Sequence, residues 1–394
     1  MRLLQRYVLS ELLKMFGMSL FIITLFMVLV GVFRNAQQQG MGAGQILPLI
    51  PYLLPEALRY AIPGTILLAA SSVYGRLSAS NELVAIKAAG ISPGAVLWPT
   101  YIFTFLLSLV AVWMNDLASS WGHDGVQRVA VEEVEDIVYG MLQMNKSYST
   151  NRFSISVKGV RGRKLILPAL SFNGDDKNPA VTITAKEAEM KADLDEKILR
   201  ITFRGDCDIK VDGSISSHFP EFERDVPLEE ASKTGSSSSP AYTSMREIPA
   251  ALARHLERVD QIREGLALRS GFQLMCGDFD GLAAGDGGKG ENTLRDELSN
   301  VHRLQTEPPR RWANGFSCLA FVLVGAPLAI RLRNAELLSS FFLCFGPILV
   351  VYYPLLLFAT DRAKRGELPP ELVWSGNLLL VFWGAWLLKR VYRY

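Results

Sequence analysis

Residues 12–33, LLKMFGMSLFIITLFMVLVGVF, form an apolar stretch that holds one charged side chain, Lys14. Its length matches the roughly 20 residues that a helix needs to cross a hydrocarbon layer about 30 Å thick. Five similar runs follow, and the six are Leu12–Phe33, Ala57–Val73, Val96–Leu117, Trp312–Ile330, Leu337–Ala359 and Leu372–Leu388. Three runs precede a long polar stretch and three follow it. The sequence therefore predicts an α-helical membrane protein with six transmembrane helices, arranged 3+3, and one large extramembrane domain.

Composition excludes several other classes of protein. The chain of 394 residues carries a net charge of +2, so it has no global field that would attract nucleic acid. Met1–Lys14 has scattered charges and no small-residue cleavage pattern follows the first run, so no signal peptide is expected. The cysteines show no metal-ligand spacing, and no metal or other cofactor is expected. Cys207 and Cys276 could form a disulfide in an oxidising compartment, but two unpaired thiols are the favoured interpretation.

Positive charges near the span ends predict the orientation, because they concentrate on the cytoplasmic side. With a cytoplasmic N-terminus, the inside residues are Arg2, Arg6, Lys14, Arg76, Lys87, Arg331, Arg333, Lys389, Arg390 and Arg393. The opposite short loops hold Arg34, Arg59, Arg362, Lys364 and Arg365. The bias predicts that both termini are cytoplasmic and the polar domain is outside. The segment 361–365 is an exception, partly offset by Asp361 and Glu367.

The first residues of the chain have two interpretations. Arg2–Phe16 carries its apolar side chains on one helical stripe, with Arg2, Arg6 and Lys14 elsewhere. This pattern fits an interfacial helix that leads into the first span. A simple cytoplasmic extension of the first span is an equally good interpretation.

The polar stretch Ala118–Pro309 changes character midway. Apolar residues first alternate with period two, as at Phe153, Ile155 and Val157, and turn signals at 173–175, 193–197 and 212–213 separate the runs. Such short strands with regular turns predict a β-sandwich or jelly roll, over residues 118–235.

Residues 236–309 have a different pattern. Ser236–Ser239 marks a linker. Ser244 and Glu247 have the spacing of a capping box, and helical periodicity then predicts an amphipathic helix over Met245–Arg269. Gly271–Asn292 is rich in Gly and Asp and is predicted to be a mobile loop. The expected domains are thus 1–117, 118–235, 236–309 and 310–394.

Two fragments imitate enzyme signatures without the required context. Gly90–Gly94 fits G-x-S-x-G, but it lies in a short loop between two spans rather than after a strand of an α/β sheet. All four histidines, His123, His218, His255 and His302, lie in the external stretch, across the membrane from Ser92. Gly287–Gly290 lacks the spacing and the Ser/Thr of a phosphate loop. The chain is therefore expected not to be an enzyme.

The apolar runs also bear on the source of energy. A gradient-driven carrier usually keeps ionisable residues in mid-span, and none of the six runs holds one at its centre. With no ATP site in the chain, this pattern favours a motor supplied by another subunit.

Several segments together resemble one family. In the first half they are Leu54–Glu56, Ile62–Pro63, Tyr74–Leu77 and Asn81–Ser92; in the second they are Gly325–Arg331 and Gly366–Pro370, with Trp374 and Asn377. These segments are similar to the lipopolysaccharide-export permeases of the LptF/LptG (YjgP/YjgQ) family. The resemblance covers about residues 1–125 and 305–394. The Gly/Asp-rich insertion and the Glu307–Arg311 lead-in to the fourth span depart from the family pattern.

The resemblance implies a permease subunit of an ABC exporter in the inner membrane. Such a subunit faces a second LptF/LptG-type permease and is driven by a cytoplasmic ABC ATPase dimer (LptB-like). It would extract lipopolysaccharide or a related glycolipid from the membrane and pass it to a periplasmic bridge protein (LptC/LptA-like). The β domain would then be a periplasmic jelly roll.

The resemblance also implies roles for two residues. Glu82 lies in the loop after the second span, where the family has a coupling helix that pairs with the ATPase; a solvated glutamate is the alternative. Arg34 ends the first span at the external side, where the family position is basic. A guanidinium there can bind lipid phosphate bidentately, and interfacial anchoring is the alternative. Arg59 is expected to pair with Glu56.

Two other functions remain open from the residues alone. One is a non-transporting membrane scaffold whose periplasmic β domain recruits envelope proteins, and the other is an ion-coupled carrier. A co-purifying ATPase would separate the exporter from both. The sequence leaves open whether the chain is LptF-like, LptG-like or pairs with itself, and which glycolipid it carries.

Overall fold

The computed structural model describes residues 2–39, 47–132, 134–149, 153–172, 181–193, 198–211, 214–227, 240–277, 288–333 and 336–393. They form two compact units: residues 1–26, 55–120 and 239–394 in one, and residues 27–54 and 121–238 in the other. The expected linker Ser236–Ser239 and the expected turns at 173–175 and 212–213 lie outside the described residues. Of the turn expected at 193–197, only Asp193 is described.

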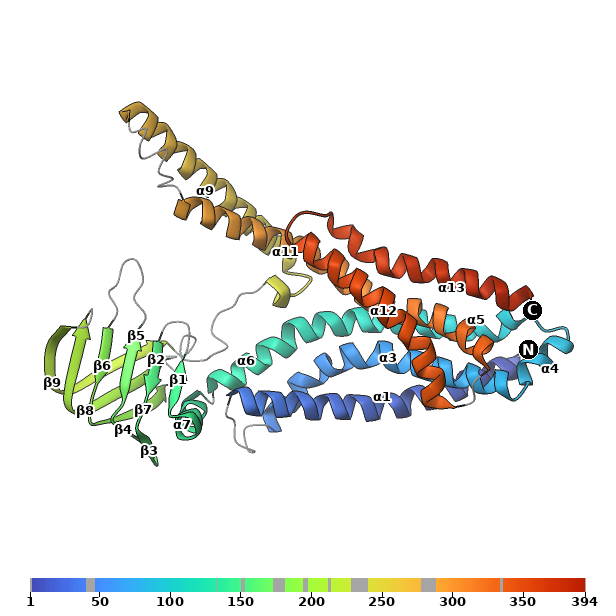
Figure 1. Cartoon of the computed structure of the whole chain (residues 1–394), viewed down its shortest axis with the longest axis horizontal. Helices are drawn as coiled ribbons and strands as arrows, with labels where there is room; N and C mark the ends of the chain where they lie inside the picture. Colours follow the sequence, from blue (N-terminus) through green and yellow to red (C-terminus); the bar gives the residue numbers. More distant parts are fainter. Residues whose placement is uncertain are drawn as a thin grey trace. The chain divides into compact units, whose positions relative to one another are not determined.

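Six helices of the described residues are long and apolar enough to cross a membrane, which confirms the predicted spans. They are α1 (Arg2–Gln39), α3 (Ile50–Ala79), α5 (Pro93–Leu117), α11 (Gly288–Leu332), α12 (Leu337–Lys364) and α13 (Ser375–Arg393) (Figure 1). Helix α1 begins at Arg2 and continues without a break. The start of the chain is therefore an extension of the first span, the second of the two interpretations given above.

The membrane helices are joined by hydrogen bonds from small polar side chains to backbone carbonyls of other helices. Ser78 Oγ donates to the carbonyl of Ile330 at 2.6 Å, and Ser340 Oγ donates to that of Ser71 at 3.0 Å. Asn377 Nδ2 donates to the carbonyl of Ala313 at 2.7 Å. Such bonds replace the water that a bilayer cannot supply. They fix α3, α12 and α13 in register with their neighbours.

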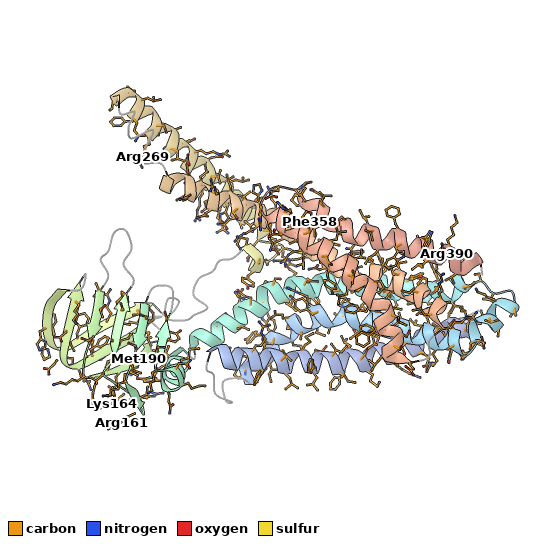
Figure 2. The ribbon with its side chains drawn as sticks, in the orientation of Figure 1. Arg161, Lys164, Met190, Arg269, Phe358 and Arg390 are labelled. Atoms are coloured by element: carbon orange, nitrogen blue, oxygen red, sulfur yellow. The ribbon has the colours of Figure 1, made fainter. Side chains whose placement is uncertain are left out.

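The segment before the fourth span forms a helical hairpin. Helix α9 (Ile248–Cys276) runs antiparallel to the first half of α11: Leu304 packs near the start of α9, and Glu297 lies 2.6 Å from Nδ1 of His255 (Figure 1). Arg269, farther along α9, is labelled in Figure 2. The hairpin confirms the predicted amphipathic helix, although its start differs. Pro249 fits the first turn of a helix that begins at Ile248, and no side chain caps that start.

The loop predicted over Gly271–Asn292 is wrong at both ends. Residues 271–276 continue α9, which ends at Gly277 with φ of 70°. This left-handed conformation is the usual glycine stop of a helix. Residues 288–292 already belong to α11, which continues through Pro308 and Pro309 into the membrane. Residues 278–287 lie outside the described part of the chain.

The inserted domain confirms the predicted β structure. Two helices that the sequence did not predict, α6 (His123–Glu132) and α7 (Val134–Asn145), precede a curled antiparallel sheet (Figure 1). Its strands are β1 (Ser147–Ser149), β2 (Phe153–Ser156), β3 (Gly159–Arg161), β4 (Lys164–Ile166), β5 (Ala169–Phe172), β6 (Val181–Thr184), β7 (Glu187–Asp193), β8 (Ile198–Val211) and β9 (Ser214–Pro227). Their order is β1-β2-β5-β6-β8-β7-β4-β3, with β9 paired to β8. Alternate side chains, such as Phe153, Ile155 and Met190 (Figure 2), fill the core on one face.

Strand β8 contains two runs of alternating apolar residues, 199–203 and 207–211, in one continuous strand. Its register against β9 shifts between Arg204 and Cys207, where Gly205 and Asp206 have φ of 76° and 50°. A β-bulge with glycine in the left-handed region lets a strand bend without ending. Cys207 returns to the core beyond the bulge and is a free thiol, as is the exposed Cys276.

Candidate functional site

The expected coupling loop is a short helix at one end of the membrane helices. Helix α4 (Glu82–Ala88) lies between α3 and α5, bounded by Asn81 and Gly90, whose φ values are 59° and 78°. Glu82 opens the helix, is exposed, and accepts a hydrogen bond from Ser80 Oγ at 3.1 Å. Leu83 is buried, whereas Val84 is about half exposed. The helix thus packs inward through Leu83 and the partly buried Ile86, and it presents a carboxylate and an apolar side chain outward.

Two side-chain hydrogen bonds join helix ends at this end of the bundle. Lys87 Nζ donates to the carbonyl of Val391 at 3.1 Å, which joins α4 to the end of α13. Gln5 Nε2 donates to the carbonyl of Ala95 at 3.1 Å, which joins α1 to the start of α5. Figure 1 shows both chain termini beside α4. A displacement of α4 would therefore act on α13, to which Lys87 attaches it, and on α5, which follows it in the chain.

The same end of the bundle contains an ion pair between α1 and α3. Arg76 Nη2 lies 2.6 Å from Glu11 Oε2, and Lys14 lies 3.5 Å from the other oxygen of the same carboxylate. Arg390, labelled in Figure 2, stacks 3.7 Å from the ring centroid of Trp386 on α13. These basic side chains cover the end of the bundle next to α4.

The two basic residues expected on the opposite side lie in different surroundings. Arg34 is exposed in the last turns of α1. Arg59 donates to Tyr60 Oη at 2.7 Å and to Ser119 Oγ at 3.3 Å, and its guanidinium lies 4.8 Å from the Tyr60 ring centroid. The expected Arg59–Glu56 pair is therefore wrong among the described residues, because Tyr60 and Ser119 take the two terminal nitrogens. Glu82 and Arg34 belong to different compact units.

A buried arginine that the sequence analysis did not identify joins three segments. Arg311 is 2% exposed, and its Nη1 donates to Asp116 Oδ1, at the end of α5, at 2.6 Å. Its Nη2 donates to the carbonyls of Ala241 and Thr243, at 3.0 and 2.7 Å. Asp116 also accepts the backbone N–H of Met245 at 2.9 Å. We call these five residues the Arg311 clasp, since they hold residues 241–245 against α5 and α11.

Glu307, one helical turn before Arg311, is 1% exposed by its side chain. Its Oε2 accepts from Arg310 Nη2 at 2.6 Å and lies 3.6 Å from Arg311 Nε. Its Oε1 has no hydrogen-bond partner among the described residues, and Lys364 Nζ is 3.8 Å away. The spacing of Glu307, Arg310 and Arg311 could have been read as helical ion pairs. The pairing of Arg311 with Asp116, 195 positions away, could not have been read from the sequence.

The exception to the charge bias is explained by pairing. Arg365 lies 2.9 Å from Asp361, Arg362 pairs with Glu367, and Lys364 faces Glu307. Each cation at the end of α12 thus has a carboxylate nearby, which reduces its cost at the membrane surface. Among the described residues no cluster of side chains suits a metal ion.

The chain has two groups of three membrane helices with a β domain inserted between them. This architecture defines a multi-pass membrane protein with a large extramembrane domain. The sequence matches the lipopolysaccharide export system permease LptF/LptG over residues 6–390, so the chain belongs to this family and the resemblance is confirmed. Family membership assigns the chain to the permeases of lipopolysaccharide export, in the inner membrane, and to a system with further Lpt components. A search of curated proteins gave no match.

Proposed function

We propose that this chain is the membrane subunit of an ABC exporter that extracts lipopolysaccharide or a related glycolipid and passes it to a periplasmic bridge. In this proposal a cytoplasmic ATPase dimer (LptB-like) docks on α4, and both chain termini are cytoplasmic. The observation that carries the proposal is the geometry of α4. Its outward face holds Glu82 and Val84, while Lys87 attaches its other end to α13.

Glu82 suits an electrostatic contact with an ATPase. An exposed carboxylate at the first position of a helix is also oriented favourably by the helix dipole. An isolated surface pair is worth only about 0–1 kcal/mol, so the apolar Val84 and the neighbouring backbone must supply the rest of the contact. The proposed role of Glu82 is therefore to fix the position of the ATPase contact through its negative charge. Movement of α4 then passes to α13 through Lys87 and to α5 along the chain.

The lipid-facing surface supports a second permease as partner. In the apolar part of each helix, 22% of the residues are buried in α1 and 17% in α12, compared with 67% in α11. Large apolar side chains, including Phe26 on α1 and Phe342 on α12, are more than half exposed. Two such faces from two permeases would enclose a cavity for a lipid, as the family resemblance implies. Arg34 would then meet the phosphates of a glycolipid headgroup at the external end of α1.

The β domain suits docking to a bridge protein. Strand β9 pairs with β8 along most of its length and is not paired on its other side within the described residues. Addition of a strand to such an edge is a common way for β domains to join. We propose this edge for the contact with an LptC/LptA-like protein.

The proposed function is tested by co-expression with an LptB-like ATPase and a second LptF/LptG-type permease, followed by purification in mild detergent. Parent protein should co-purify with both and show ATP hydrolysis that lipopolysaccharide stimulates. Glu82→Lys should lose assembly or at least about tenfold of the stimulated hydrolysis, because attraction to a basic surface becomes repulsion. The exposed Glu264, which lies on α9 rather than on α4, provides the matched control, and Glu264→Lys should behave like the parent.

Two results would contradict the proposal. A Glu82→Lys chain that assembles and hydrolyses ATP like the Glu264→Lys control would remove Glu82 from coupling. A chain that recruits envelope proteins but never binds an ATPase would instead support the scaffold function.

A further inference from the structure

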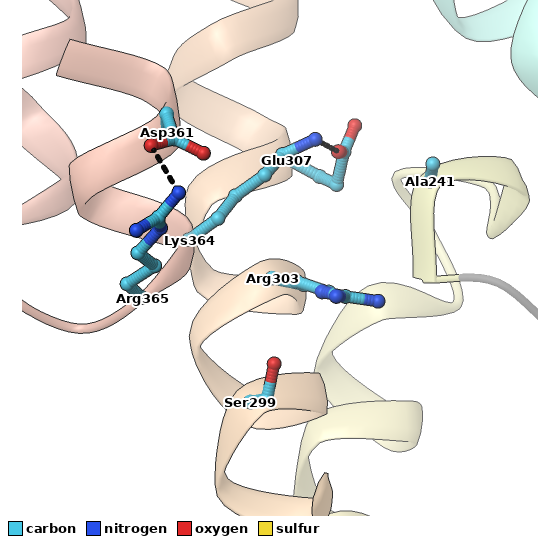
Figure 3. A pocket seen from close by; sticks show the side chains of 7 residues that line it. All are labelled: Ala241, Ser299, Arg303, Glu307, Asp361, Lys364 and Arg365. Atoms are coloured by element: carbon cyan, nitrogen blue, oxygen red, sulfur yellow. Dashed lines mark ion pairs between the residues drawn. The ribbon is translucent and has the colours of Figure 1, made fainter. Parts of the chain in front are cut away.

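A pocket of about 340 Å³ lies where the hairpin meets the end of α12. Helix α11 contributes Ser299, Arg303 and Glu307 on one side, and α12 and the residue after it contribute Asp361, Lys364 and Arg365 on the other (Figure 3). Both walls belong to the same compact unit. The first wall comes from the part of α11 that pairs with α9.

The pocket contains cations that no carboxylate fully neutralises. Asp361 is paired with Arg365 at 2.9 Å, and Glu307 directs its Oε2 to Arg310 at 2.6 Å. Arg303 is exposed and has no hydrogen bond or ion pair within the described residues. Lys364 lies 3.8 Å from Glu307 Oε1, which is too far for a hydrogen bond. Arg303 is therefore free to bind an anion, and Lys364, whose ion pair with Glu307 is too long for a hydrogen bond, can donate to the same anion.

The pocket also contains an acceptor without a donor. Glu307 Oε1 is buried and has no hydrogen-bond partner in the described structure, although a buried carboxylate oxygen usually has one. A hydroxyl group is a donor that fits this position without adding charge, and Ser299 offers a further hydroxyl beside Arg303. The lining thus combines two cations for an oxyanion with one acceptor for a neighbouring hydroxyl.

We propose that this pocket binds a phosphate group carried on a hydroxylated ring, that is, a sugar phosphate. Arg303 and Lys364 bind the phosphate oxygens, and a hydroxyl of the same sugar donates to Glu307 Oε1. A phosphorylated glycolipid headgroup and a free sugar phosphate share this chemistry. The lipid source rests on the proposed function, whereas binding itself does not.

Calorimetric titration of the full chain in phosphatidylcholine nanodiscs, without ATPase, tests the pocket. The probes are glucosamine 1-phosphate, glucosamine and inorganic phosphate. Glucosamine 1-phosphate should bind more tightly than either fragment. Loss of a charge-assisted hydrogen bond should weaken its binding roughly ten- to a hundredfold in Arg303→Glu and in Lys364→Gln. The matched control Arg295→Glu, on an exposed part of α11 outside the lining, should change binding by less than about twofold.

The results test three points separately: whether the pocket binds a sugar phosphate, whether that ligand is a lipid headgroup, and whether binding depends on the proposed export function. Equal affinities of Arg303→Glu and Arg295→Glu would overturn the pocket, and equal binding of inorganic phosphate and glucosamine 1-phosphate would overturn the role of Glu307 Oε1. Nanodiscs that also contain diphosphorylated lipid A should displace the soluble probe if the ligand is a lipid headgroup. Binding without such displacement assigns the pocket to a free sugar phosphate. Because Arg303 is exposed and unpaired among the described residues, Arg303→Glu should fold normally, and failure of ATPase docking would leave all these measurements intact.

Discussion

The Arg311 clasp should be a main source of stability in the membrane unit, and Arg311→Met tests it. Methionine keeps much of the volume and the apolar stem but removes every donor. The change deletes the 2.6 Å contact with Asp116 and the two bonds to the carbonyls of Ala241 and Thr243. Removing one partner of a buried ion pair typically costs about 3–5 kcal/mol, because the other charge is left without compensation.

The structure favours the lower end of that range. Asp116 is 26% exposed by its side chain, so water can reach it, and it keeps the N–H of Met245 at 2.9 Å. We therefore expect Arg311→Met to lower the free energy of unfolding by about 3 kcal/mol. Asp116→Asn keeps an oxygen acceptor for Arg311 and loses only the charge, so its cost should be about 1.5 kcal/mol. The double variant should cost less than the sum by roughly 1 kcal/mol, since both changes remove the same contact.

Unfolding in mixed micelles of dodecyl maltoside and SDS, followed by tryptophan fluorescence, measures these values. The matched control is Arg365→Met, because Arg365 pairs with Asp361 across a surface where both side chains are more than half exposed. Such a pair contributes about 0–1 kcal/mol. Equal unfolding free energies for Arg311→Met and Arg365→Met would refute the reasoning. Strict additivity of Asp116→Asn and Arg311→Met would show that the two side chains do not interact.

Three further predictions concern lipid, packing and topology. Arg34→Glu should reduce both lipid photo-crosslinking at the end of α1 and lipid export, and Arg34→Lys should have a smaller effect. Normal export by Arg34→Glu would show that Arg34 only anchors the span at the interface. Gly384→Ala should destabilise by about 1–3 kcal/mol, because its Cβ would lie 2.7 Å from a carbonyl oxygen of α11, whereas Gly346→Ala meets nothing within 4 Å; equal unfolding midpoints would contradict this. The exposed Cys276 should react with an impermeant maleimide from the periplasmic side only, and a cysteine at Ser80 from the cytoplasmic side only; labelling of both from one side would overturn the orientation.

The membrane helices could be predicted because a bilayer imposes a strict length and polarity on each span. Leu12–Phe33 and the five other runs satisfied this rule, and all six became helices. Their limits were less predictable. Helix α11 begins at Gly288, 24 residues before the expected start at Trp312, since its first half is polar and is held by α9 instead of by lipid.

The sequence predicted that this domain consists of β-strands, but it did not predict where each strand begins and ends. The alternation at Phe153 and Ile155 reports which side chains face the core, and both are buried. It does not report that 199–203 and 207–211 belong to one strand. That result depends on Gly205 and Asp206 adopting positive φ, which turn-forming residues permit but do not require.

The sequence could likewise identify some of the candidate site residues but not others. Glu82 could be selected because it lies in a local motif, and the structure places it on an exposed short helix. Arg311 could not, because its importance comes from Asp116 and from two carbonyls that only the fold brings near. A positive residue before a span is most simply read as a topology signal. Only burial distinguishes it from a structural ion pair.

Glu307 lies between the Arg311 clasp and the proposed sugar phosphate pocket, and this position decides which variants can test each. Its Oε2 faces Arg310 and Arg311, while its Oε1 faces Lys364 and the pocket. Any substitution of Glu307 changes both environments, so a loss of ligand binding or of stability in such a variant could not be assigned to either. Arg303 and Arg311 lie about two helical turns apart on the same helix, and each belongs to only one of the two sites. Stability lost in Arg311→Met, together with ligand binding lost in Arg303→Glu, would therefore show that the Arg311 clasp and the sugar phosphate pocket are separate sites although both contact Glu307.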